Sequence, residues 1–219
     1  EIRPVSRSSE EAGSLPAAVL AAAHELGLVG NGLPEQYGGG GEPSALTGCL
    51  IAEELAWGDL AIALAILSPS LLGVPVARFG SEEQKRAILP GLTGAAFKPG
   101  RLAAVEPRFD SDAFRPTATA KRDGNGWLLE GSKCQVPWIA GGEDLLVIAS
   151  GEGRPEAFLV PRNAAGLRTV PESNLGTRAL PLVELTLAGV KLPASARLGG
   201  EAGCDVREIL DRGRIGLSA

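Results

Sequence analysis

Hydrophobic residues in the first part of the chain recur with helical spacing, and glycine and proline interrupt them. A helix is predicted from Ser14, a suitable N-cap, through "LPAAVLAAAHELGLVG". A second apolar helix is predicted to start near Ser44 and run through "ALTGCLIAEELAWGDLAIALAIL". "GSEEQKRAIL" predicts another helix start, because Ser81 and Gln84 have the spacing of a capping box.

One uncharged stretch, "LAIALAILSPSLLGVPVA" at residues 60–77, reaches the length of a membrane span. Pro69, Gly73 and Pro75 interrupt it, and each disfavours an unbroken helix. We therefore expect two buried helices with a break between them, and no membrane insertion.

From Arg101 onward the pattern changes to short apolar or alternating segments of strand length. Asp-Gly-Asn-Gly at 123–126 predicts a hairpin, and "DLLVIAS", "AFLVPR", "LRTVPE" and "LVELTLAGVKLP" predict further strands. The pattern becomes helical again at "CDVREILDRGRIGLSA". The predicted fold class is α+β multidomain: an N-terminal all-α domain at 1–98, a small antiparallel β-barrel or sandwich at 99–198, and the beginning of a C-terminal helical bundle at 199–219.

Composition narrows the function classes. The net charge of -5 gives no electrostatic reason to bind nucleic acid or an anionic membrane. Three well-separated cysteines suit a reducing compartment without a thiol-ligated metal, and no signal peptide opens the chain, so we expect a cytoplasmic protein. The single histidine, His24, lies in an alanine-rich helical pattern and is interpreted as structural, with a catalytic role as the alternative. The absence of methionine indicates either a fragment or substituted methionines, and both remain open.

Five segments resemble the acyl-CoA dehydrogenase flavoprotein family in their residues, their order and their spacing. They are "LPEQYGGGG" at 33–41, "GSEEQKRAILPGL" at 80–92, Glu-Pro at 106–107, "DGNGWLLEGSK" at 123–133 and "DRGRIGLSA" at 211–219. The resemblance implies an N-terminal helical domain, a middle β domain and a C-terminal helical domain, with FAD between the last two. It also implies oxidation of an acyl-CoA substrate to its trans-2-enoyl form, with hydride transfer to flavin N5.

The resemblance further implies an electron-transferring flavoprotein as electron acceptor and a homo- or hetero-oligomer of family members. The cofactor-binding residues that it implies lie in two segments. The first contains Ala104, Val105, Glu106 and Ser111, and the second contains Gln135, Val136 and Pro137. Val105 stands where the family has a threonine whose hydroxyl contacts the flavin. Pro137 has neither a hydroxyl nor an N–H to donate, and Trp138 beside it is a candidate for an aromatic wall.

No catalytic base is predicted within residues 1–219, because the family's carboxylate is expected beyond Ala219. The interpretation is an FAD-dependent acyl-CoA dehydrogenase. Two alternatives stay open: a non-catalytic or half-site partner subunit of a heteromeric acyl-CoA dehydrogenase, and a flavin oxidase or monooxygenase on the same scaffold. For Glu106 itself, fixing the turn by accepting backbone N–H bonds is the alternative to a ligand role.

Overall fold

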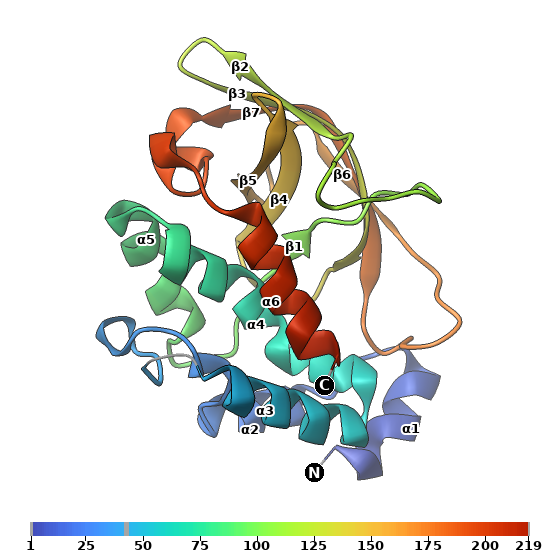
Figure 1. The fold of residues 1–219 in the computed structure, drawn as a ribbon. Coiled ribbons are helices and arrows are strands. Elements are labelled where there is room, and N and C mark those ends of the chain that lie inside the picture. Colours follow the sequence, from blue (N-terminus) through green and yellow to red (C-terminus); the bar gives the residue numbers. More distant parts are fainter. Residues whose placement is uncertain (1, 42–43, 219) are drawn as a thin grey trace.

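The computed structural model describes residues 2–41 and 44–218, and places a layer of helices beneath a curled sheet (Figure 1). Within this range, α1 to α5 precede the sheet and α6 follows it. Their bounds are Arg3–Ala12 (α1), Ala17–Glu25 (α2), Ala45–Gly58 (α3), Leu60–Phe79 (α4), Glu82–Leu92 (α5) and Val206–Ser218 (α6). The predicted order of helices, β region and renewed helix is therefore confirmed, while the domain boundaries stay predictions.

Two helices begin where the sequence predicted, and one does not. Ser44 caps α3, and Ser81 with Gln84 forms the expected capping box at α5. The expectation that Ser14 caps the next helix is wrong, because α2 begins after Pro16. Proline has a fixed φ and no N–H, so it suits a helix start better than an interior position. The polar helix α1 lies before the region where helices were predicted.

The break predicted near Pro69 and Pro75 is also wrong. The chain breaks at Asp59, whose extended backbone ends α3 and whose carboxylate accepts a hydrogen bond from the Ile62 N–H to cap α4. α4 then continues through both prolines. An interior proline costs about 3 kcal/mol in an isolated helix, but α4 packs against α3, α5 and β4, and that burial outweighs the local cost.

Among the described residues, α4 alone has the length and composition of a membrane span. The helix occupies the middle of the helical layer, and 61% of its most apolar stretch is buried within the protein. A core helix has the same composition, because a helix surrounded by other elements is apolar on all sides. The expectation of no membrane insertion stays a prediction.

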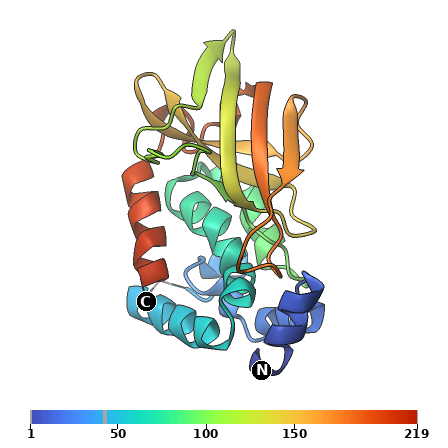
Figure 2. The same ribbon diagram turned by 90° about the vertical axis from the view of Figure 1, so that its right-hand side faces the viewer.

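In the part of the chain that the structure describes, seven strands form one sheet, and β4 pairs with β1, β2 and β5. They are Leu102–Ala103 (β1), Thr119–Asp123 (β2), Gly126–Pro137 (β3), Asp144–Gly151 (β4), Arg154–Pro161 (β5), Leu167–Pro171 (β6) and Leu182–Pro193 (β7). β5 lies along one edge of β4, while β2, β3, β7 and β6 continue the sheet on the other side. Figure 2 shows β3, β7 and β6 side by side, with α6 running past the helical layer.

The sheet is mixed, although an antiparallel one was predicted. β1 and β2 both pair with β4 in parallel, β1 at Leu146 and Val147 and β2 at Ser150 and Gly151. They share one edge of β4 end to end because the chain leaves that edge after β1 and returns to it in the same direction at β2. The hairpin of β2 and β3 and the remaining pairs are antiparallel, as predicted.

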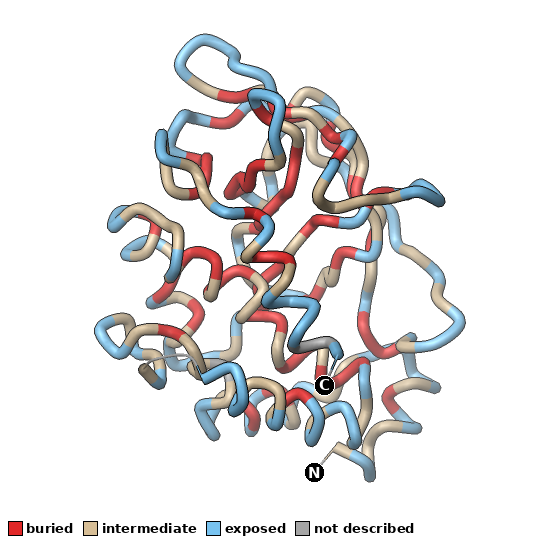
Figure 3. The backbone as a smooth tube through the Cα atoms, viewed as in Figure 1, coloured by how far each residue is buried: buried red, intermediate tan, exposed pale blue. Residues whose placement is uncertain are grey.

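Both faces of β4 are buried, which explains its unbroken apolar sequence. Leu145, Val147 and Ala149 point into the curl of the sheet, where Trp127 packs edge to face with Phe158 at 5.1 Å between ring centroids. Leu146 and Ile148 belong instead to a core that the sheet shares with the helices. Figure 3 shows buried stretches of the chain where the helical layer meets the curl of the sheet. The core shared by helices and sheet also includes residues of α4, α5 and α6.

Side-chain hydrogen bonds from Gln84 fix the path of the chain between β7 and α6. The side-chain amide of Gln84 donates to the carbonyls of Ser195 and Arg197 and accepts from the Gly199 N–H. Arg197 is itself buried and forms an ion pair with the buried Glu156 of β5. The start of α5, the sheet and the approach to α6 are therefore held at one point.

Asp59→Ala is expected to lower the free energy of unfolding by about 1–2 kcal/mol, since it removes the cap of the central helix. It also removes the acceptor for the Ser6 hydroxyl of α1. Chemical denaturation measures the loss. Ser44→Ala is the matched control, because Ser44 caps α3 in a more exposed position. If Ser44→Ala lowered the free energy of unfolding as much as Asp59→Ala does, the cap of α4 by Asp59 would have no special importance for stability.

Candidate functional site

The loop 104–117 projects from one edge of the sheet and is anchored to β4 at both ends. Before the loop, the carbonyl of Arg101 accepts a hydrogen bond from the Leu146 N–H at 2.9 Å. After it, the carbonyl of Ala118 accepts one from the Ser150 N–H at 2.7 Å. Both ends of the loop are thus fixed on the same strand, and the intervening residues are free to form a projecting structure.

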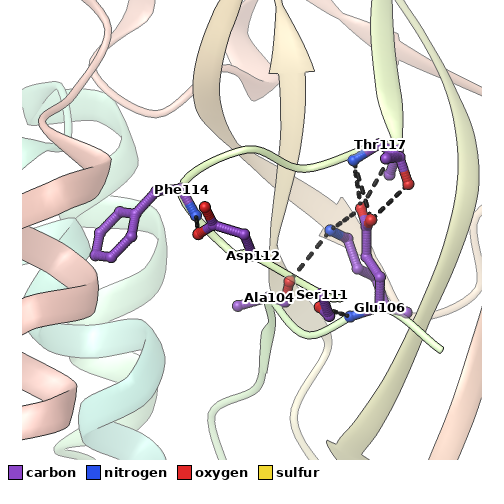
Figure 4. Close-up of polar contacts among 8 residues, drawn as sticks. Ala104, Glu106, Ser111, Asp112, Phe114 and Thr117 are labelled. Atoms are coloured by element: carbon purple, nitrogen blue, oxygen red, sulfur yellow. Dashed lines mark hydrogen bonds and ion pairs between the residues drawn. The ribbon is translucent and has the colours of Figure 1, made fainter. Parts of the chain in front are cut away.

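The carboxylate of Glu106 closes this loop from inside (Figure 4). It accepts hydrogen bonds from the Thr117 N–H at 2.9 Å, the Ala118 N–H at 2.8 Å and the Thr117 hydroxyl at 2.5 Å. The ammonium of Lys133 donates to it at 2.9 Å. Glu106 is 4% exposed and Lys133 is fully buried, so this is an internal ion pair.

These donors determine the charge state of Glu106. Burial by itself would raise the pKa of the carboxyl group, but the hydrogen bonds from Ala118, Thr117 and Lys133 outweigh burial and lower the pKa to about 2. For Lys133, burial lowers the pKa, and the charge of Glu106 opposes that effect. The pair is therefore ionised at neutral pH, and Glu106 is a poor proton acceptor.

One glycine permits this packing. Gly131 of β3 lies directly against the Ala118 backbone, and a Cβ at this position would lie 2.6 Å from the Ala118 Cα. Its φ of 136° also lies in the region that favours glycine. Gly131 therefore lets β3 approach the backbone N–H groups that Glu106 binds.

A β-bulge in β3 brings the second predicted segment beside the first. The register against β7 shifts between Lys133 and Val136, so Cys134 and Gln135 are left out of that pairing. The Cys134 N–H donates to the carbonyl of Val105 at 3.0 Å, and Lys133 donates to the carbonyl of Ala104 at 3.3 Å. Gln135 has a left-handed φ of 55°, and its N–H donates to Glu172 at 2.7 Å.

The predicted cofactor residues differ in what they present to the surface. Val105 is 41% exposed, and Gln135 in the bulge is also exposed. Ala104 and Val136 are buried, so a contribution from either to ligand binding would come through its backbone. Pro137 is half-buried. Ser111 is half-buried, and its hydroxyl accepts the Glu106 N–H at 3.0 Å.

The outer part of the loop makes contact with α6. Phe114 points from the loop toward that helix (Figure 4), and the guanidinium groups of Arg207 and Arg214 each lie 4.6 Å from its ring centroid. Contacts of this kind are attractive because the ring face is electronegative. At the loop tip, Phe109 is fully exposed beside an ion pair of Arg108 and Asp110.

Sequence reasoning missed the partners of the two segments. Lys133 was noted only as part of a family motif, and neither Thr117 nor Glu172 was identified. A signal for Lys133 exists in the alternation of β3, because Trp127, Leu129 and Lys133 share the buried face. A lysine on such a face requires a buried acid nearby. Glu172 lies on a connection after β6, and no local pattern indicates its contact with Gln135.

Comparison with known proteins identifies relatives of this chain. Residues 1–95 match the family model "Acyl-CoA dehydrogenase, N-terminal domain". Acyl-CoA dehydrogenase FadE12 of Mycobacterium tuberculosis is 34% identical over 187 residues, which are 83% of this chain and 48% of that protein. Glutaryl-CoA dehydrogenase of Desulfococcus multivorans is 36% identical over 184 residues, which are 80% and 47% respectively. The chain belongs to the acyl-CoA dehydrogenase family.

A solved structure of a family member extends the similarity to the fold. A glutaryl-CoA dehydrogenase from Mycobacterium smegmatis in complex with FADH2 matches with a TM-score of 0.85 at 29% identity. The match covers 99% of this chain and 55% of that one. The chain thus spans about half the length of the curated relatives named above. The family membership and fold expected from the sequence are confirmed, whereas the individual cofactor-binding residues stay predictions.

Glu106→Gln is expected to lower the free energy of unfolding at pH 7 by roughly 3–5 kcal/mol, because it leaves the buried Lys133 ammonium without a counter-charge. Chemical denaturation measures this loss. Glu82→Gln is the control: Glu82 also forms an ion pair with a lysine, but at the surface, so its replacement should change little. Equal effects of the two substitutions would contradict the structural role of Glu106.

The cost of Glu106→Gln should also depend on pH. Since the folded pKa of about 2 lies below the ordinary value of 4.5, the unfolded chain binds more protons between these values. The stabilisation by Glu106 is complete above pH of about 5 and is lost as the pH falls toward about 2. The difference in unfolding free energy between wild type and variant should shrink over this range, and a constant difference would show that ionisation of Glu106 is not its source.

Proposed function

We propose that the chain is part of an FAD-dependent acyl-CoA dehydrogenase that forms the α,β double bond of an acyl-CoA thioester. The observation that carries the proposal is the junction where Val105 meets the bulge at Cys134 and Gln135. The two predicted segments, far apart in the sequence, meet there through the hydrogen bond from Cys134 to Val105. We propose that the flat flavin ring lies against this junction.

The residues at the junction fit a flavin. An exposed apolar side chain, Val105, lies beside backbone that the bulge has released from pairing with β7. We propose that the backbone of Ala104, Val105 and Gln135 to Pro137 would hold the ring, with Ser111 and Glu106 shaping the loop around it. When bound, FAD would supply the acceptor for the hydride that leaves the acyl chain.

The chain's own contribution is positioning. The ion pair of Glu106 and Lys133 holds the loop closed, and the left-handed Gln135 holds the bulge in place. Glu106 does not suit the role of catalytic base, since its low pKa and its hydrogen bonds leave it little affinity for a proton. We propose that the base comes from the part of the relatives' length that this chain does not cover.

The remaining expectations are part of the same proposal. The substrate is an acyl-CoA, the electron acceptor is an electron-transferring flavoprotein, and the protein assembles as a homo- or hetero-oligomer. A cytoplasmic location is supported by the three free cysteines, Cys49, Cys134 and Cys204.

Pro137 favours a second candidate function. It offers no N–H and no hydroxyl at a position where the resemblance implies a hydrogen bond to the flavin, and Val105 also lacks a hydroxyl. A chain with these two residues could serve as a non-catalytic or half-site partner of a catalytic homologue. The two functions differ in whether the protein binds flavin by itself.

The test is the visible spectrum of the full-length protein purified alone. A yellow protein whose flavin band bleaches under anaerobic conditions with an acyl-CoA, and recovers slowly in air, is the expected result. A panel including glutaryl-CoA, butyryl-CoA and longer thioesters would identify the substrate class. A folded, colourless protein that becomes yellow only with a co-expressed homologue would overturn the first function in favour of the second. Rapid recovery in air would indicate an oxidase instead.

Val105→Asp is expected to weaken flavin binding at least about tenfold, because it places a charged group against the apolar ring face. Fluorescence titration of the apoprotein with FAD measures the change. Leu26→Asp is the matched control, since Leu26 is also an exposed apolar residue but belongs to the helical layer. Unchanged affinity in Val105→Asp would place the cofactor elsewhere.

A further inference from the structure

Arg101 is a buried cation that differs from the other two in the described part of the chain. Lys133 pairs with Glu106, and Arg197 pairs with Glu156. Arg101 is 0% exposed, yet its hydrogen-bond acceptors are carbonyl groups and not a carboxylate. They belong to Ile139 at 2.5 Å, to Gly142 at 3.2 Å, and to Gly141.

Burying this charge is costly. An arginine removed from water loses several kcal/mol of solvation, and neutral carbonyl dipoles return less than an ion pair would. Burial, with a smaller contribution from the neighbouring Arg162, lowers the pKa of Arg101 to about 10. The group still carries its charge at neutral pH. A methionine of similar length would avoid the cost, so the guanidinium must contribute something that packing alone does not.

The guanidinium organises the turn that follows β3. It gathers three carbonyl groups from residues 139–142, and it lies 5.0 Å from the ring centroid of Trp138. Gly142 lies so close that a Cβ there would be 2.8 Å from the Arg101 Nη1, and its φ is 66°. The path of the turn is therefore built around this side chain.

The ring of Trp138 makes further contacts within the chain. A second guanidinium, that of Arg162, lies 5.1 Å from the same ring centroid. The ring packs against the core inside the sheet. The backbone N–H of Trp138 donates to the carbonyl of Pro181 at 2.8 Å. Trp138 thus acts as a link between Arg101 and the end of β3.

The residues between Lys133 and Trp138 are held from both sides. On one side, the bulge is fixed by the bonds from Cys134 to Val105 and from Gln135 to Glu172. On the other side, Arg101 fixes the turn that begins at Trp138. The segment Gln135–Pro137 is the one through which the proposed function places the flavin.

We propose that Arg101 is a positioning residue for cofactor binding, because its buried guanidinium fixes the turn 138–142 and thereby the backbone of Gln135–Pro137. This inference rests on the proposed function for its ligand. Arg101 makes no contact with the flavin in this proposal and acts through Trp138 and the carbonyl groups. The order that Arg101 imposes on residues 134–142 can be measured by hydrogen exchange without the cofactor.

The test compares Arg101→Met with Arg162→Met in the full-length protein. Both remove a guanidinium from the Trp138 ring, but Arg162 is half-buried and makes only one long hydrogen bond to the turn, at 3.4 Å. In Arg101→Met, the amides of residues 134–142 should exchange hydrogen at least about tenfold faster, while those of α5 remain unchanged. The dissociation constant for FAD should rise by a similar factor. Arg162→Met should change either quantity by less than about threefold.

Arg101→Lys keeps the charge but cannot reach three carbonyl groups at once, so it should restore flavin affinity only in part. Should Arg101→Met fail to fold, Arg101→Lys and Gly142→Ala provide the same two measurements with smaller changes. Wild-type exchange at 134–142 in these variants would overturn the inference. A wild-type protein that does not bind FAD would overturn the proposed function, while the exchange measurement would still decide whether Arg101 holds the segment.

Discussion

The buried ion pair of Glu106 and Lys133 is the interaction on which the arrangement of the candidate site depends. It joins the two segments, which also meet through the hydrogen bonds from Lys133 to Ala104 and from Cys134 to Val105. It also ties the end of the loop 104–117 to its beginning. Separating the pair would leave a charge buried in the sheet, which costs far more than the loss of a surface ion pair. The loop therefore keeps its shape although its tip is exposed.

The protein uses buried polar groups at three places to fix backbone that regular pairing does not hold. Glu106 binds the returning end of a loop, Gln84 binds the approach to α6, and Arg101 binds the turn after β3. In each case the side chain contacts backbone groups, whose positions it then determines. Glu106 acts on the loop that carries Val105 and Arg101 acts on the turn after the bulged strand β3, whereas Gln84 acts on the approach to α6.

Much of the fold is predictable from local patterns. The capping box at Ser81 specifies a helix start because its two hydrogen bonds lie within four residues. The Asp-Gly-Asn-Gly turn specifies a hairpin for a similar reason. The continuity of α4 is not predictable in this way. Its prolines indicate a break, and only the surrounding helices and β4 supply the burial that outweighs them.

For the candidate site, the sequence by itself determined the chemical types of the residues, and its resemblance to a family predicted two cofactor-binding segments. The tertiary structure decided that the two segments meet and that the Glu106 carboxylate holds the loop through its ion pair with Lys133. It also decided that Arg101 has carbonyl groups as its hydrogen-bond acceptors. The physical reason is the distance along the chain. A hydrogen bond within a turn joins residues close in the sequence, so it leaves a local sequence pattern. The partner of a buried charge depends on how distant strands pack, and the sequence alone offers several acids that could pair with it.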